Sequence, residues 1–161
     1  MASDYELLSV FGRDYPGEKP WELLEWCSRL GADEFTVTGI RAGNGSVEVF
    51  EDFDRMTDRH RRVQAPRRHL NTAHRELEPT DLWSLNADTT AALRRAFPRG
   101  FFNYFPADAW FEDLNVYRRG DLMLGVITHE AEGILRVTSQ ERSNLQTAGF
   151  PYELRGQWVG Y

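Results

Sequence analysis

The stretch AWFEDLNVYRRGDLMLGVIT, residues 109–128, contains the strongest fold signal in the chain. Two apolar segments, 109–117 and 122–128, flank the polar connection RRGD, in which Gly120 can adopt a left-handed backbone. This pattern predicts a pair of antiparallel strands joined by a tight turn.

The sequence after this pair extends the same pattern. The segment ILRV, residues 134–137, predicts a third strand after the polar turn HEAEG. Thr138 and Glu141 have the spacing of a capping box, so we expect a helix over 139–147 that ends at Gly149.

The N-terminal third predicts a β-α-β-β order. We expect a strand over 5–11 and a helix over 20–30, with a proline in its first turn and a glycine after its end. The segment EFTVTGI, residues 34–40, alternates as a half-buried strand does. We read AGNGS as a hairpin connection and SVEVFEDF, residues 46–53, as the returning strand.

The middle of the chain has no strand pattern between residues 54 and 85. Apolar residues at 66, 70, 73 and 77 recur at helical spacing, so we predict a short helix over 66–77. A second short helix is expected after Asn86 or Asp88, and it should stop before Pro98.

These elements predict one α+β domain over residues 1–161, with a mainly antiparallel sheet and helices packed on one face. The expected order is β-α-β-β, an Arg/His-rich helical connection over about 54–98, then β-β-β-α and an aromatic tail. We expect this tail, which ends with Trp158 and Tyr161, to dock on the domain.

Composition limits the function classes. The chain has one cysteine, Cys27, so it cannot contain an internal disulfide, and we expect the thiol to be buried and inert. The N-terminal residues lack a signal-peptide pattern, and no segment approaches the ~20 apolar residues of a membrane span. We therefore expect a cytoplasmic protein without a membrane role. The net charge of −6 disfavours nucleic acid as a partner.

The strongest unusual feature is a basic segment, residues 55–75. It contains seven arginines and one acidic residue, Asp58, for a charge of +6, so the rest of the chain carries −12. Two interpretations remain open: the arginines pair with acidic residues of the same chain, or they form a surface for an acidic partner. The candidate binding residues are Arg59, Arg61, Arg62, Arg67, Arg68, His69 and Arg75.

The candidate catalytic residues are His129, Glu130 and Glu132, a histidine followed by two possible acid–base carboxylates. The segment begins like a zinc-protease motif but lacks the second histidine, and a polar turn is the simpler interpretation. The histidines of the basic segment also lack a ligand spacing. The sequence contains no nucleophile elbow, P-loop or dinucleotide fingerprint, so we predict no metal and no cofactor.

Three functions are compatible with these features. The first is a small protein-binding domain, such as an inhibitor or immunity-type protein, that acts by charge-complementary contact with another protein. The partner would be acidic if it met the basic segment, or a basic enzyme if it met the acidic remainder. The second is an enzyme that acts on an anionic small molecule with a His/Glu acid–base pair. The third is an RNA- or nucleotide-binding module, which the lack of aromatic residues in the basic segment disfavours.

Overall fold

The structure is a computed structural model that describes residues 4–42, 47–67, 78–103 and 108–157. Within these residues, the strands form one eight-stranded sheet with the order β3-β4-β2-β5-β6-β7-β1-β8, and each paired neighbour is antiparallel. The strands are β1 (Tyr5–Phe11), β2 (Glu34–Arg41), β3 (Arg61–Arg67), β4 (Glu78–Ser84), β5 (Ala109–Arg118), β6 (Asp121–Ile127), β7 (Glu132–Thr138) and β8 (Glu153–Gln157).

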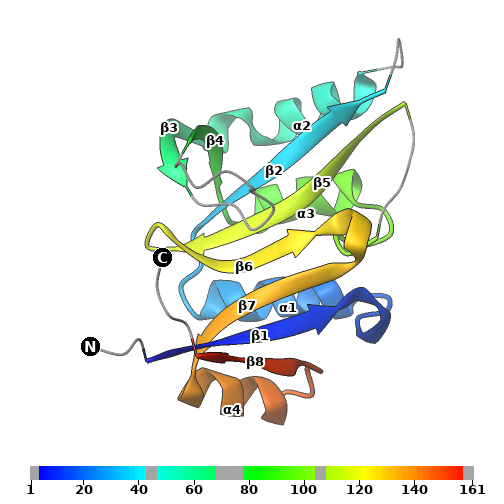
Figure 1. The fold of residues 1–161 in the computed structure, drawn as a ribbon. Helices are drawn as coiled ribbons and strands as arrows, with labels where there is room; N and C mark the ends of the chain where they lie inside the picture. The colour runs from blue at the N-terminus through cyan, green and yellow to red at the C-terminus, as the bar shows by residue number, and fades with distance from the viewer. Residues whose placement is uncertain (1–3, 43–46, 68–77, 104–107, 158–161) are drawn as a thin grey trace.

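All the α-helices in the described ranges contribute to one hydrophobic core. These helices are α1 (Lys19–Arg29), α2 (Glu48–Thr57), α3 (Ala87–Ala96) and α4 (Ser139–Thr147), and the short 3-10 helices are η1 (Gly12–Asp14), η2 (Asp58–His60) and η3 (Thr128–Glu130). Leu24 of α1, Phe53 of α2, Leu93 of α3 and Leu145 of α4 belong to the same buried cluster. Figure 1 shows α1 and α3 on the same side of the sheet. The predicted α+β fold, with helices on one face, is confirmed.

The strands present alternate residues to this core. Leu8 and Val10 of β1 are buried in the cluster, as are Leu135 and Val137 of β7. Because successive side chains of a strand point to opposite faces, the residues between them lie on the other face of the sheet. We call this the helix-free face. Its partly exposed apolar residues include Tyr5, Leu7, Phe11, Ile40, Trp110, Ile127 and Ile134.

Several predicted elements are confirmed. The strand over residues 5–11 and the pair in 109–128 form as expected, and Gly120 has the left-handed backbone of its turn, with φ of 83°. The helix after Thr138 also forms. These segments have local signals, in period or in capping residues, that agree with the tertiary structure.

The predicted strand over residues 46–53 is wrong, because the segment 48–57 is helix α2. Val49, Phe50, Phe53 and Met56 lie against the core, and their spacing also fits one face of a helix. A short apolar run of this kind fits both the helical and the strand period. In the structure the segment is helical and packs against α3 and β5. The predicted AGNGS connection falls largely on residues 43–46, outside the described residues.

The Arg/His-rich connection over 54–98 is not purely helical, which corrects the predicted arrangement. It contains the antiparallel pair β3 and β4. The prediction that residues 54–85 contain no strand is therefore wrong. The predicted helix over 66–77 begins inside β3, and residues 68–77 lie outside the described residues. Each strand contains a proline, and Pro66 lies opposite Pro79. Because proline within a segment argues against a strand, the sequence pattern did not predict either one. The helix after Asn86 is α3, as expected.

The C-terminal tail includes a strand that the sequence did not predict. Strand β8 pairs with β1, so this part of the tail docks on the domain by main-chain pairing. The tail's terminal aromatic residues, Trp158 and Tyr161, lie outside the described residues.

Candidate functional site

The described arginines of the basic segment fold back on acidic residues of the same chain. An Arg59 Nη atom lies 2.6 Å from Asp88 Oδ2, and an Arg61 Nη atom lies 3.2 Å from Asp54 Oδ1. Arg55 likewise pairs with Asp52. These pairs are largely exposed, so each stabilises the fold little. They favour the self-paired interpretation for this part of the segment.

Arg62 makes the most buried of these contacts. Its Nη1 lies 2.7 Å from Glu34 Oε1, whose side chain is only 9% exposed, and its Nε donates to Ser84 Oγ at 2.9 Å. The guanidinium therefore compensates a buried carboxylate of β2 and links β3 to β4. Of the other predicted binding residues, only the backbone of Arg67 is described, and Arg68, His69 and Arg75 lie outside the described residues.

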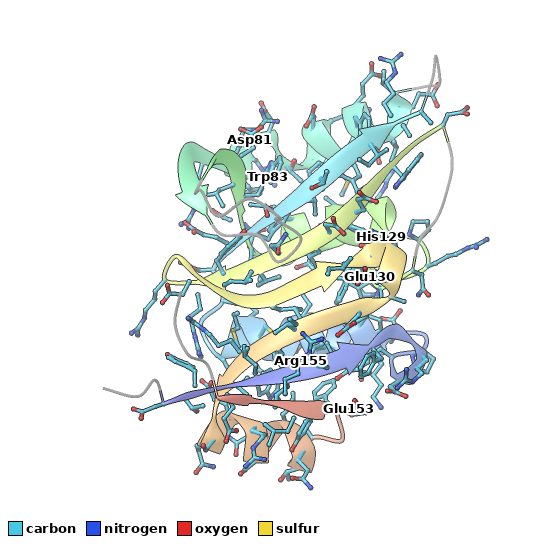
Figure 2. The ribbon with its side chains drawn as sticks, in the orientation of Figure 1. Asp81, Trp83, His129, Glu130, Glu153 and Arg155 are labelled. Carbon is cyan, nitrogen blue, oxygen red and sulfur yellow. The ribbon has the colours of Figure 1, made fainter. Side chains whose placement is uncertain are left out.

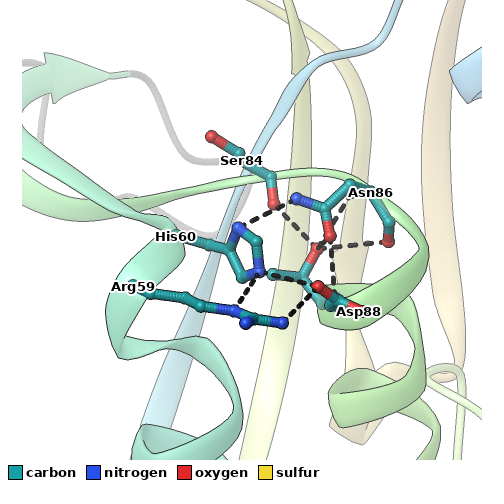
Figure 3. Close-up of polar contacts among 6 residues, drawn as sticks. Arg59, His60, Ser84, Asn86 and Asp88 are labelled. Carbon is teal, nitrogen blue, oxygen red and sulfur yellow. Dashed lines mark hydrogen bonds and ion pairs between the residues drawn. The ribbon is translucent and has the colours of Figure 1, made fainter.

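A second polar network joins η2 to the start of α3, as Figure 3 shows. Asn86 Oδ1 accepts a hydrogen bond from Thr89 N, which leaves its Nδ2 to donate to His60 Nδ1 at 3.2 Å. His60 Nε2 lies 3.1 Å from Asp88 Oδ2 and 3.1 Å from Arg59 Nε. The hydrogen bonds from His60 and Arg59 hold the pKa of Asp88 below its usual value. The network fixes η2 to the start of α3.

The structure places the predicted catalytic residues on η3 and the start of β7. His129 Nε2 lies 3.9 Å from Glu130 Oε1, beyond hydrogen-bonding distance, and both side chains are at least half exposed (Figure 2). Glu132 is directed elsewhere: its Oε1 lies 3.0 Å from an Arg155 Nη atom and accepts from Ser9 Oγ. The three residues therefore do not form one constellation. These residues are also far from the basic segment. Strand β6, which leads into η3, is separated in the sheet from β3 and its arginines by three strands, β4, β2 and β5.

Sequence reasoning missed two acidic residues beside His129. Asp113 sits in a bulge of β5 with a left-handed backbone, φ of 53°, and is buried. Its N–H donates to Thr128 Oγ1 at 2.9 Å, and Thr128 N donates to Asp113 Oδ1 at 3.0 Å. This reciprocal pair fixes the start of η3, on which His129 lies. No local signal marks the bulge, because it depends on pairing with β2.

The pKa of the neighbouring Glu112 is raised above its usual value. Burial is the main cause, and the Asp113 carboxylate adds to it, while Trp110 and His129 act in the opposite direction. His129 is therefore close enough to affect the pKa of Glu112. Such a carboxyl can hold a proton more readily than an exposed one, which general acid catalysis requires.

The helix-free face combines buried polar groups with half-exposed apolar ones. Thr36 Oγ1 and Tyr117 OH lie 3.3 Å apart, and both residues are buried although they point away from the main core. Toward β1, an arginine stacks on each of two aromatic rings: Arg136 Cζ is 4.6 Å from the Tyr5 ring centroid, and Arg13 Cζ is 4.4 Å from that of Phe11. Stacking of this kind orders the guanidinium groups.

The described residues contain no cluster of three or more His, Cys, Asp or Glu side chains that could hold a metal ion. None of the described helices is long and apolar enough to cross a membrane. Comparison with known proteins finds no matching family model, no matching curated protein and no matching solved structure.

Proposed function

We propose that the chain is a protein-binding domain that recognises its partner through the helix-free face. The observation that carries this proposal is the composition of that face. Half-exposed Leu7, Ile127 and Ile134 lie on neighbouring strands, beside the stacked pair of Arg136 and Tyr5. Aromatic and arginine side chains are enriched at the centres of protein interfaces, which are also more apolar than their rims.

The charge of the chain supports a basic partner. The net charge is −6, and the described arginines of the basic segment are paired with carboxylates of the same chain. Unbalanced negative charge would steer a basic protein toward the domain and raise the association rate at low salt. An inhibitor or immunity-type protein that neutralises a basic enzyme is the concrete form of this proposal. The single cysteine supports a reducing, cytoplasmic location.

The test is affinity isolation of partners with the tagged chain from its native cell, followed by titration with the purified partner. Ile134→Glu places a charge in the middle of the helix-free face and is expected to weaken binding by about tenfold or more. Ser143→Glu, on the exposed surface of α4, is the matched control and should bind as the unmodified chain does. Both variants are first checked for unchanged circular dichroism and thermal unfolding.

Two kinds of outcome would contradict this proposal. Full affinity in Ile134→Glu, or loss of affinity in Ser143→Glu, would contradict the proposed surface. A partner that is acidic, or an association rate that does not fall as salt rises, would contradict the electrostatic part of the proposal.

A second candidate function is an acid–base enzyme at Glu112 and His129. It is favoured by the raised pKa of Glu112 and by the strained bulge beside it, since such features cluster at active sites. A screen of anionic metabolites would test this function. Turnover that survives both Glu112→Gln and His129→Ala would exclude these residues as its catalytic pair.

A further inference from the structure

The sheet ends in two edge strands of different character. Within the described residues, β3 pairs only with β4, and β8 pairs only with β1. An edge strand presents backbone groups that can pair with another strand. The β3 sequence contains three arginines and Pro66, which would repel a second copy and interrupt its ladder. Strand β8 contains one arginine and no proline.

Three residues of β8 give this edge a self-complementary surface. Leu154 is 54% exposed and is the one large hydrophobic residue that is exposed in the described part of the chain. It is flanked by Glu153 and Arg155, whose side chains are 67% and 48% exposed. The two side chains also contact Arg13 and Glu132 of the same chain, at 3.7 and 3.0 Å, but their exposure leaves them accessible to a second molecule. Figure 2 shows Glu153 at the edge strand, whereas the Arg155 side chain reaches across β1 toward Glu132 of β7.

We propose that β8 is a homodimer interface in which two copies pair antiparallel about a two-fold axis at Leu154. This arrangement places Leu154 against Leu154 of the second copy, and Glu153 of each copy opposite Arg155 of the other. An isologous interface requires this kind of self-complementary pattern. Opposite charges directly across an antiparallel pair are favourable, and like charges are not.

The rest of the fold holds this edge in place. Tyr15 OH donates to Pro151 O at 2.7 Å, immediately before β8, and Phe150 is buried in the core. Pairing is limited to a few residues, because β8 is short and Arg155 itself lies in a bulge of its pairing with β1. We therefore expect a weak dimer that depends on concentration. It would join two sheets into one and make the helix-free faces continuous, but it does not depend on the proposed function.

Variants that reverse the charge at position 153 or 155 test the proposed dimer, with the oligomeric state measured by analytical ultracentrifugation. The unmodified chain should dimerise as its concentration rises. Glu153→Arg would place arginines opposite each other, and Arg155→Glu would place glutamates opposite each other, so each variant alone should stay monomeric. An equimolar mixture of the two variants restores opposite charges at both positions and should dimerise again. The mixture also controls for altered contacts within each chain, because those are the same in the separate variants.

Ile134→Glu serves as the control for a dimer formed through the helix-free face, and it should leave dimerisation unchanged. The proposal is overturned if the unmodified chain remains monomeric up to about 1 mM, the concentration that corresponds to very weak association. It is equally overturned if folded Glu153→Arg and Arg155→Glu fail to associate in the mixture, or if Ile134→Glu abolishes the dimer. Loss of partner binding in Ile134→Glu with an intact dimer would separate this interface from the proposed recognition face.

Discussion

Asp113 holds a left-handed backbone that costs free energy, and its side chain recovers part of that cost. The carboxylate accepts from Thr128 N, and the Asp113 N–H donates to Thr128 Oγ1, in a buried setting. Asp113→Ala would retain the strained backbone and leave Thr128 N without this acceptor. We expect it to lower the free energy of unfolding by about 1–3 kcal/mol, as measured by urea denaturation.

Asp113→Asn is the matched control for this prediction. Asparagine tolerates a positive φ and retains a side-chain oxygen that can accept from Thr128 N. Its stability should therefore lie much closer to that of the unmodified protein. Equal losses in Asp113→Ala and Asp113→Asn would show that the charge, and not the hydrogen bond, maintains the bulge.

Glu112 leads to a prediction about pH. Its pKa is raised in the folded protein, mainly by burial, so the folded state binds this proton more tightly than the unfolded chain does. The ionised carboxylate therefore costs stability above its folded pKa, and this cost disappears below the pKa of the unfolded chain. Glu112→Gln should be more stable than the unmodified protein at pH 7 and no more stable at pH 3. Urea denaturation at both pH values would measure the difference, and an equal gain at both would contradict the electrostatic cause.

At the scale of elements, the capping box of α4 connects a sequence motif to a tertiary contact. Thr138 Oγ1 accepts from Glu141 N, and Thr138 N donates to Glu141 Oε2. Glu141 also lies 2.6 Å from an Arg118 Nη atom of β5. The cap therefore begins the helix and positions the residue that joins it to the sheet.

Thr138→Ala should lower the free energy of unfolding by about 1 kcal/mol, the usual cost of losing an N-cap. Thr147→Ala, near the exposed C-terminal end of the same helix, is the control and should change stability much less. Thermal unfolding of the two variants would compare them directly. A Thr138→Ala variant as stable as Thr147→Ala would mean that packing alone maintains α4.

The elements differ in how far the sequence could predict them. Strands β5 and β6 and helix α4 have local signals that match their final environment, and they were predicted with nearly the observed bounds. Helix α2 was mistaken for a strand, because its few apolar residues fit either period until α3 packs against them. Strand β8 was missed because five residues containing a glycine and two charges acquire their strand character only by pairing with β1.

The candidate site was less predictable than the fold for the same reason. His129 and Glu130 could be identified as residue types, but Glu112 and Asp113 approach them only through the bulge in β5. The pairing of Arg62 with Glu34 likewise joins positions that are far apart in the chain. Sequence patterns report on periodicity, whereas these contacts depend on the register between strands.

At the scale of the whole molecule, Cys27 reports on the unfolding of the single core. The thiol is buried in the cluster that all four described helices share, and burial raises its pKa to about 12. A thiol-specific reagent should therefore modify the protein only through opening of the core, and the rate should rise with urea as steeply as the global unfolding equilibrium does. Reaction kinetics in low urea would measure this slope. A shallower slope would show that α1 opens locally, and would mean that the helix-covered side is not one cooperative unit.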